Sequence, residues 1–338
     1  MNKVSKSLLL TGAVLILLGG MILALTACSS DSSLNNLFGA RYETNTHEIT
    51  ENFDNISIDT GTANIELLPS EESSCRIVCH EHSKIKHEVK VTDGTLTVTE
   101  VDTRKWYDHI SFGFNETKIS LYLPEENYSA LKITESTGDI TIPTDFIFES
   151  IELKLSTGDV KCSASAADAM KIDASTGNVS IENASATSLE ISVSTGNIKV
   201  SDVSCGSFTA NLSTGKTVIT NVTCESFASK ASTGDFIFDK VEIVNNCTIE
   251  RSTGDVELKD TTAGILNVTT DTGDVDFERS DATEITVKTD TGKVRGSLLT
   301  EKIFIVRTDT GKIDVPETTS GGKCKITTDT GDIKITID

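Results

Sequence analysis

The stretch TTDTGDV, Thr269 to Val275, contains the tripeptide Asp-Thr-Gly, which carries the catalytic carboxylate in aspartic proteases. The same tripeptide recurs at Asp59, Asp290, Asp309 and Asp329. An aspartic protease needs two such carboxylates that converge across one cleft and share one proton. The number of copies therefore points to a repeat rather than to a catalyst.

A Thr-Gly pair returns at intervals of 19 or 20 residues from about residue 130 to the end of the sequence. Each pair follows Ser or Asp and precedes Asp, Asn or Lys. A fixed period of this length indicates a repeat architecture, in which each unit contacts its neighbours. The glycines of the eleven units are Gly138, Gly158, Gly177, Gly196, Gly215, Gly234, Gly254, Gly273, Gly292, Gly311 and Gly331.

Aligning the units on their glycines gives four apolar columns, at seven and five residues before the glycine and at two and four residues after it. Only Ser229, Thr217 and Gly296 interrupt these columns. Apolar residues two apart indicate strands with one buried face, and the glycine permits the positive φ of a corner between them. A shorter third side has small residues that we expect to point inward, namely Ala184, Ala186, Val203, Cys205, Val222 and Cys224.

This pattern predicts an all-β fold, a parallel β-solenoid of about eleven coils that spans residues 131–338. Stacking at about 4.8 Å per coil gives a rod roughly 50 Å long. The general crossover rule favours a right-handed coil. The Asp-Thr-Gly copies then lie along one edge of the rod, so we predict corners and not a protease.

The acidic corner column has a second interpretation, a row of weak calcium sites at Asp271, Asp290, Asp309 and Asp329, helped by the neighbouring Asp274 and Asp332. Lys293 and Lys312 interrupt that row. We therefore expect no metal and no cofactor, with calcium as the weaker alternative.

Residues 1–28 differ from the rest of the chain. Lys3 and Lys6 precede an apolar run from Leu8 to Ala27 that contains no charge, which is typical of an export signal. The run ends in Leu-Thr-Ala-Cys28 and resembles a bacterial lipoprotein signal, in which the cysteine is lipidated. The apolar run is also long enough to span a bilayer, so an uncleaved membrane helix is the alternative. Both interpretations place the rest of the chain outside the membrane, anchored at its N-terminus.

Residues 29–44 read as a tether, and residues 45–130 lack the regular spacing. We expect 45–130 to form a β cap over the first coil, with one degenerate coil around Gly61 and a hairpin turn at Asp93-Gly94. An alternative role for this part is an aromatic platform for a glycan, formed by Trp106, Tyr107, His109, Phe112 and Phe114.

The sequence resembles a bacterial "putative adhesin" domain family of unknown function, found in exported and membrane-anchored proteins of Gram-positive bacteria. The resemblance rests on IDTGTANIELLPS, VTDGTLTV, RKWYDHISF, ISLYLP and the run of STGD corners, and it covers roughly residues 45–338. It implies a β-solenoid and, because some members are encoded beside envelope-stress genes, a role at the cell envelope. It supplies no catalytic or binding residues.

Seven cysteines remain apart from Cys28, and an odd number cannot all pair within one chain. Cys205 and Cys224 share a register position in neighbouring coils, about 5 Å apart, and are candidates for a disulfide, with two buried thiols as the alternative.

A cysteine- and histidine-rich segment contains Cys75, Cys79, His80, His82 and His87. On a strand Cys75 and Cys79 lie about 13 Å apart, too far to share one zinc ion. His80 and His82 could converge with His87 across a hairpin, but no fourth ligand is evident. We therefore expect ordinary strand residues rather than a zinc site.

A net charge of −21 argues against nucleic acid as a partner. We predict a non-catalytic, surface-anchored rod that binds a glycan, a cell-wall polymer or a protein. The alternatives are an enzyme acting on polysaccharide and a component of envelope-stress signalling. Enzymes with this fold build clefts from long loops, and the constant interval leaves no room for one. The last strand, DIKITID, has no capping unit after it, so we also expect self-association through the C-terminal coil.

Overall fold

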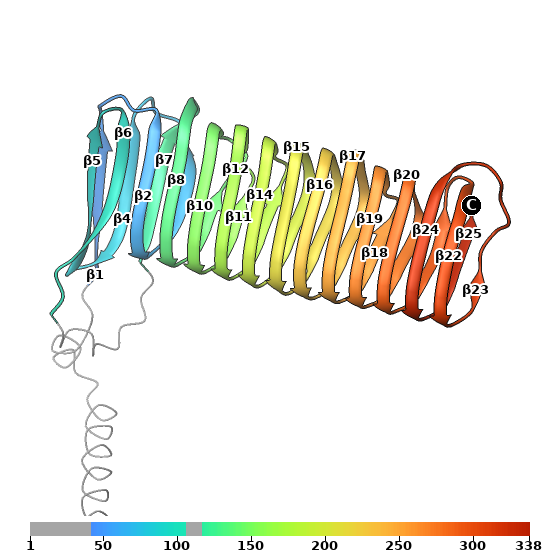
Figure 1. Cartoon of the computed structure of the whole chain (residues 1–338). Coiled ribbons are helices and arrows are strands. Elements are labelled where there is room, and N and C mark those ends of the chain that lie inside the picture. Colours follow the sequence, from blue (N-terminus) through green and yellow to red (C-terminus); the bar gives the residue numbers. More distant parts are fainter. Residues whose placement is uncertain (1–41, 106–116) are drawn as a thin grey trace, which may run out of the picture.

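A computed structural model describes residues 42–105 and 117–338, which form one rod of stacked β-strands (Figure 1). The predicted anchor and Cys28, most of the tether and the aromatic platform of Trp106, Tyr107, His109, Phe112 and Phe114 lie outside the described residues. No helix in the described ranges is long and apolar enough to cross a membrane. The strands are β1 (Tyr42–Ile49), β2 (Asn55–Thr62), β3 (Asn64–Ser70), β4 (Cys75–His82), β5 (Ile85–Thr92), β6 (Thr95–Asp102), β7 (Lys118–Pro124), β8 (Asn127–Thr137), β9 (Ile140–Ile142), β10 (Ile147–Thr157), β11 (Val160–Cys162), β12 (Ser165–Thr176), β13 (Val179–Glu182), β14 (Ser185–Thr195), β15 (Ile198–Thr214), β16 (Thr217–Thr233), β17 (Phe236–Thr253), β18 (Val256–Lys259), β19 (Thr262–Thr272), β20 (Val275–Thr291), β21 (Val294–Leu298), β22 (Lys302–Thr310), β23 (Ile313–Asp314), β24 (Gly322–Thr330) and β25 (Ile333–Ile337).

From β8 onward every pairing between strands is parallel and follows the predicted columns. In one representative pair, β15 and β16, Phe208 lies beside Phe227 and Cys205 beside Cys224. The small residues of the third side are buried, as predicted from their spacing. The core is one continuous hydrophobic cluster along the rod, so the predicted parallel β-solenoid is confirmed.

The corner glycines allow the coils to approach one another closely. A Cβ built on Gly215 would lie 1.6 Å from the carbonyl oxygen of Gly196, and φ of Gly215 is +140°. An alanine at this position would therefore clash with the backbone of the preceding coil. The glycine is required both for the corner and for the stacking of the coils.

The residue after each corner glycine links its coil to the next. The amide of Asp159 donates to Asp139 Oδ1 over 2.8 Å, and the amide of Asn178 donates to Asp159 Oδ1 over 2.7 Å. The same bond recurs further along the rod, with donor amides at Asn197, Lys216, Asp255, Asp274, Lys293 and Lys312. Asp and Asn side chains thus act as a hydrogen-bonded ladder at this corner.

A second corner lies six residues after the glycine. There Asn183, Asp202, Asn221, Lys240, Asp260 and Arg279 adopt φ between +46° and +58°. Asn and Asp tolerate this left-handed conformation better than other residues with a Cβ. This signal was present in the sequence, although the four apolar columns do not reveal it.

The order of coils at the C-terminal end differs from the order in the sequence. Strand β20 pairs with β24, and β24 pairs on its other side with β22. The final strand β25 lies between β21 and β23 in the same way. The coil of Gly331 is therefore inserted between the coils of Gly292 and Gly311.

This insertion corrects two expectations from the sequence. The open end of the rod is the coil of β22 and β23, and not the C-terminal strand, whose Asp338 amide donates to Leu298 O over 2.9 Å. Four residues expected in the core, Phe304, Val306, Ile313 and Val315, belong to this outermost coil. Phe304, Val306 and Val315 are only partly buried and Ile313 is 46% exposed, because no further coil of the described residues covers them.

At the N-terminal end two walls of strands extend the solenoid. One wall runs from β9 through β3, β7 and β4 to β1, and the other from β8 through β2 and β6 to β5. Asp93 and Gly94 form the two-residue turn between β5 and β6, with φ of 49° and 71°, as predicted.

The degenerate coil is shifted by two residues from its expected position. Strand β2 aligns Thr62 with Thr137, and a Cβ on Gly138 would meet the carbonyl oxygen of Ala63. The corner of this coil is therefore at Ala63 and not at Gly61.

Candidate functional site

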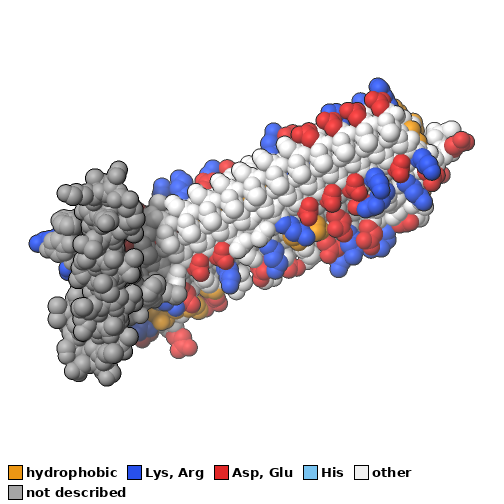
Figure 2. Space-filling model, turned by 90° about the horizontal axis from the view of Figure 1, so that it is seen from below, with side chains coloured by type: hydrophobic (Ala, Val, Ile, Leu, Met, Phe, Trp, Pro, Cys, Tyr) orange, Lys and Arg blue, Asp and Glu red, His pale blue; other side chains and the backbone are white. Residues whose placement is uncertain are grey.

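A row of threonines forms one exposed edge of the rod. The threonine before each of the eleven corner glycines, from Thr137 to Thr330, is exposed, and successive members pair in register between coils. Figure 2 shows, on one face, a pale band with few charged side chains that runs along the rod between rows of Lys, Arg, Asp and Glu. Hydroxyl groups at a constant spacing suit contact with an extended ligand.

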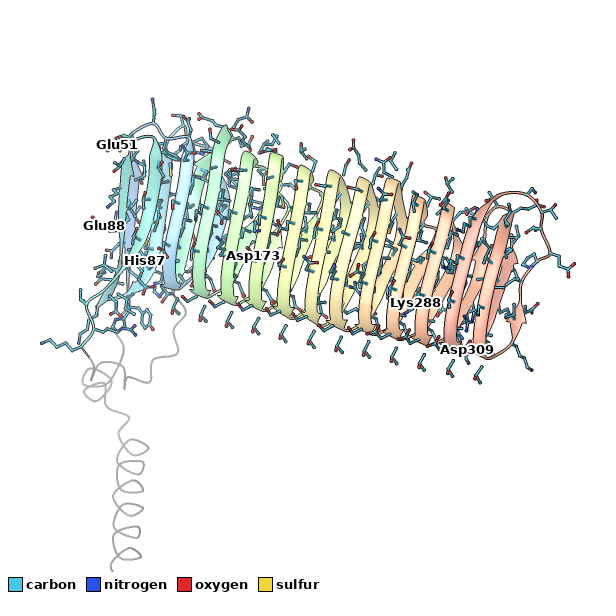
Figure 3. The ribbon with its side chains drawn as sticks, in the orientation of Figure 1. Glu51, His87, Glu88, Asp173, Lys288 and Asp309 are labelled. Atoms are coloured by element: carbon cyan, nitrogen blue, oxygen red, sulfur yellow. The ribbon has the colours of Figure 1, made fainter. Side chains whose placement is uncertain are left out.

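Beside this edge lies a shallow trough of about 740 Å³ that crosses six successive coils. In each of the first five coils that line it, a buried or half-buried residue three before the glycine lies between two more exposed ones. Its rim includes the serines that precede the threonines, and its lining is Asp173, Ala174, Ser175, Ser192, Val193, Ser194, Asn211, Leu212, Ser213, Lys230, Ala231, Ser232, Glu250, Arg251, Ser252, Thr269 and Asp271. Asp173 marks the end nearer the cap (Figure 3).

The trough is mostly uncharged in its central part. Lys230 and Glu250 neutralise each other in an ion pair of 2.8 Å. What remains there is a set of serine hydroxyls, the Asn211 amide and backbone groups. Such a surface offers hydrogen bonds without a strong preference for either sign of charge.

Arg251 is the exceptional residue of the inward column beneath the trough. Arg251 is only 3% exposed, and its guanidinium lies 4.7 Å from the centre of the Phe236 ring. It donates to Ser229 Oγ over 2.9 Å and to the carbonyl oxygen of Glu250 over 3.1 Å, while Nε has no partner. Burial lowers the pKa of Arg251 to about 10. Nothing in the four apolar columns of the sequence distinguishes Arg251.

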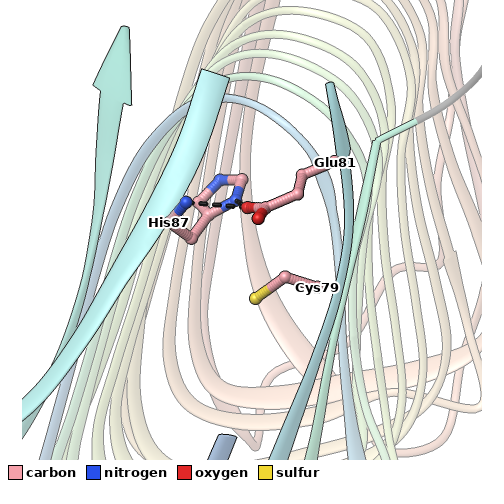
Figure 4. Close-up of side chains that lie close together, drawn as sticks. All are labelled: Cys79, Glu81 and His87. Atoms are coloured by element: carbon pink, nitrogen blue, oxygen red, sulfur yellow. Dashed lines mark hydrogen bonds and ion pairs between the residues drawn. The ribbon is translucent and has the colours of Figure 1, made fainter. Parts of the chain in front are cut away.

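A buried polar group occupies the interior of the N-terminal cap. Cys79 and Glu81 project from β4 toward His87 on β5, and one ligand atom from each lies within 4.8 Å of the other two (Figure 4). His87 Nδ1 lies 2.7 Å from Glu81 Oε2. Burial, followed by the nearby Glu81 carboxylate, raises the pKa of the Cys79 thiol to about 12.

The same interior holds two further carboxylates. Glu100 Oε2 accepts the Gly61 amide over 2.9 Å, and Glu135 Oε1 accepts the amides of Ala63 and Thr137 over 3.2 and 3.1 Å. Glu135 Oε2 has no partner. Burial raises the pKa of Glu135 to about 8 against the opposing effect of these amides.

The structure separates most of the residues that the zinc interpretation considered. His80 stacks against Tyr42 with ring centres 5.7 Å apart, and Thr44 Oγ1 lies 3.1 Å from its Nδ1. Cys75 is buried four residues before Cys79 on β4, opposite Ile49 of β1. Of the original set only Cys79 and His87 come together, and the additional residue is Glu81.

Four of the five Asp-Thr-Gly aspartates, all except Asp59, lie on successive coils along one corner. They follow the spatial order Asp271, Asp290, Asp329 and Asp309. Asp290 pairs with Lys288 at 3.0 Å and Asp309 with Arg307 at 2.9 Å, as expected for a solvated edge. Within residues 42–105 and 117–338 these aspartates do not form a cluster of three or more metal-ligating groups. Calcium binding stays an untested alternative.

Cys205 and Cys224 lie side by side on β15 and β16, as the spacing predicted, and both are buried thiols. A hydrogen bond between them lowers the pKa of Cys205 and raises that of Cys224. The disulfide stays a prediction.

Comparison with protein families identifies the chain. The family Toastrack DUF4097 matches residues 53–222 and 216–338, which together are most of the sequence. The chain belongs to this family. The finding agrees with the resemblance seen in the corner motifs, and the family's fold agrees with the solenoid described above. No curated protein is similar enough to count as a relative.

Several solved structures are similar to the chain at low identity. A "putative adhesin" from Parabacteroides distasonis is 13% identical, with 88% of this chain and 98% of that chain covered and a TM-score of 0.38. A "putative adhesin" from Bacteroides fragilis is 14% identical, with 87% and 97% covered and a TM-score of 0.28. A "putative lipid binding protein" from Parabacteroides distasonis is 14% identical, with 87% and 97% covered and a TM-score of 0.32. The family assignment does not depend on these likenesses.

Proposed function

We propose that the protein is a non-catalytic, surface-anchored rod that binds an uncharged, hydroxyl-rich polymer of the cell envelope, such as a glycan. The observation that supports this most is the serine-lined trough of about 740 Å³, which lies beside the exposed threonine row. The trough crosses six coils, and serine side chains recur in its lining from coil to coil. An extended polymer can make the same weak contact with each coil, and linked weak contacts add up to useful affinity.

The location follows from the N-terminal sequence. The basic and apolar segment of residues 1–27 and the lipoprotein-like Cys28 support attachment to the outer side of the cell membrane, through a lipid or through an uncleaved helix. The tether and the cap then project the rod away from the membrane. In this arrangement the trough is available to material outside the cell.

The regular spacing of the coils supports binding over catalysis. The interval of 19 or 20 residues leaves no insertion between coils that could close a cleft over a substrate. The trough is open, whereas catalysis benefits from a site that excludes water. An enzyme acting on polysaccharide is the alternative, and shortening of the bound polymer during incubation would identify it.

The test is binding of the full-length protein, purified in detergent, to an array of glycans and cell-wall polymers. Ser213→Trp fills the middle of the trough and should abolish binding to any polymer that the wild type retains. Thr223→Trp, on an exposed position of the third side of the rod, is the matched control and should bind normally. Equal binding by all three proteins would place the binding surface elsewhere.

We also propose that two copies of the chain associate through the open C-terminal coil. Ile303 and Ile305 on β22 are 45% and 49% exposed, and Ile313 on β23 of the same coil is 46% exposed. One edge of β22 pairs with no described strand. An apolar, unpaired edge of this kind promotes association between strands. Ile305→Lys should convert a dimer to a monomer in sedimentation experiments, whereas a wild-type monomer would refute the idea.

A further inference from the structure

The cluster of Cys79, Glu81 and His87 lies inside the cap, at the N-terminal end of the rod. Its side chains bridge the two walls of the cap, because Cys79 and Glu81 come from β4 and His87 from β5 (Figure 4). Cys79 and Glu81 are two residues apart on one strand and therefore point to the same face. Strand β5 is at the edge of its wall and pairs only with β6 among the described strands.

Burial of these three side chains is nearly complete. Cys79 is 0% exposed, Glu81 1% and His87 4%. A carboxylate, an imidazole and a thiol are costly to bury unless each has a partner. Among the described residues the Cys79 thiol has no hydrogen-bond partner that would offset its burial beside the Glu81 carboxylate. A thiolate sulfur is also a good zinc ligand.

Outer groups hold the two polar ligands in place. Asn45 Nδ2 donates to Glu81 Oε1 over 2.6 Å, and the His87 amide donates to Glu81 Oε2 over 2.7 Å. On the far side of the imidazole, His87 Nε2 lies 3.4 Å from Thr60 Oγ1, and that hydroxyl lies 3.3 Å from Glu100 Oε2. A chain from imidazole through hydroxyl to carboxylate is the type of outer contact that orients a histidine ligand.

We propose that Cys79, Glu81 and His87 form a zinc-binding site that joins the two walls of the cap. A thiolate sulfur, an imidazole nitrogen and a carboxylate oxygen are the three ligand types that zinc accepts, and a water completes a tetrahedron. Ligands around one tetrahedral zinc ion lie about 3.5 Å apart, so atoms within 4.8 Å need only small shifts to reach it.

The binding step is balanced without a further reactant. Zinc replaces the proton of the Cys79 thiol and the proton that His87 Nδ1 and Glu81 Oε2 share in their hydrogen bond, and both protons leave to solvent. It then forms bonds to Cys79 Sγ, His87 Nδ1 and a Glu81 oxygen. Nε2 of His87 keeps its proton and its contact with Thr60. The ion then fixes the edge strand β5 to β4, which stabilises the end of the rod nearest the membrane anchor.

The experiment uses the full-length protein, stripped with a chelator and then titrated with zinc, and separately with cobalt as a spectroscopic substitute. We expect one equivalent of bound zinc, a rise in the unfolding temperature on adding it, and a cobalt spectrum with a thiolate charge-transfer band and tetrahedral visible bands. Cys79→Ser should remove the charge-transfer band, and His87→Ala should remove stoichiometric binding. Thr60→Val, which changes only an outer contact, should weaken zinc roughly 10- to 100-fold.

Cys75→Ser is the matched control, because Cys75 is a buried thiol on the same strand and face but outside the cluster. It should leave the cobalt spectrum unchanged. The wild-type protein alone can overturn the proposal, even if a variant fails to fold. It would do so by retaining no zinc and showing no thiolate band with cobalt. A band that survives Cys79→Ser, or is lost in Cys75→Ser, would overturn it equally.

Discussion

Glu135 should make the protein less stable as the pH rises from 4.5 to 8. This residue begins the inward column of the regular coils, where the next coil has Leu155. Glu135 is only 2% exposed, and one of its carboxylate oxygens has no hydrogen-bond partner. Burial raises the pKa of Glu135 from 4.5 to about 8. The folded protein therefore favours the protonated acid.

The sign and size of the effect follow from proton linkage. Because the folded-state pKa is the higher one, the stabilising contribution is complete below pH 4.5 and is lost as the pH rises through 8. Each pKa unit corresponds to about 1.4 kcal/mol. Because Glu135 ionises more readily in the unfolded chain than in the folded protein, the unfolding free energy falls by about 3 kcal/mol at pH 7 and by at most about 5 kcal/mol above pH 8.

Glu135→Gln isolates this contribution. The amide keeps an oxygen that can accept the amides of Ala63 and Thr137, and it cannot ionise. We expect the variant to match the wild type at pH 4.5 and to be more stable by about 3 kcal/mol at pH 7. The measurement is urea unfolding followed by circular dichroism at pH 4.5, 6, 7 and 8, with the difference between variant and wild type plotted against pH.

Glu149→Gln, which changes an exposed carboxylate on β10, is the control and should show a flat difference. A flat difference for Glu135→Gln as well would refute the reasoning, because it would mean that the carboxylate is solvated or paired when the protein is folded. A difference that grows toward acidic pH would refute it more strongly, since it would reverse the sign.

Three further predictions concern the stacking of the coils. Gly215→Ala should lower the unfolding free energy by about 3 kcal/mol or more, because the added Cβ meets the backbone of the preceding coil. The comparison variant is Gly94→Ala in the hairpin turn, where a Cβ has no neighbour within 4 Å and only the φ of +71° is unfavourable, so the cost should be about 1 kcal/mol. Similar unfolding midpoints for the two variants would contradict the close stacking. Arg251→Leu should raise the unfolding free energy by about 1 kcal/mol by removing a buried, incompletely bonded charge, and a loss in urea unfolding would show that the guanidinium is stabilising. Under oxidising conditions Cys205 and Cys224 should form a disulfide that adds about 3 kcal/mol, and peptide mapping that recovers both as free thiols would rule it out.

The sequence was sufficient to predict the coils because each one repeats the same local requirements. A glycine corner and four inward positions at fixed distances identify the strands, and period-two alternation then identifies the buried side chains. The third side was also predictable, since Val203 and Cys205 alternate with polar residues. The Asn and Asp side chains of the two corners carried a signal too, but their role depends on contacts between coils.

The order of the last coils could not be predicted from spacing. The coils of Gly311 and Gly331 have the same column chemistry, so either can follow the coil of Gly292. A physical clue is present in β22, where Ile303 and Ile305 occupy positions that are polar in most other coils. Strand β22 thus has apolar residues on both faces, as would suit the end of the rod in contact with another chain.

The buried cluster of the cap was only partly visible in the sequence. Distance along one strand correctly separated Cys75 from Cys79. What the sequence could not show is that β4 and β5 belong to opposite walls, so that Glu81 faces His87 across the interior. The alternation of Cys79 and Glu81 on one strand face was the available signal.

The measurement that tests the proposed function most directly is binding of an envelope-polymer array by the full-length protein, its Ser213→Trp variant and its Thr223→Trp variant. We expect selective retention of an uncharged polymer by the wild type and by Thr223→Trp, with loss in Ser213→Trp and no shortening of the polymer. Retention by Ser213→Trp, or no retention by the wild type, would contradict the assignment of the trough as the binding surface.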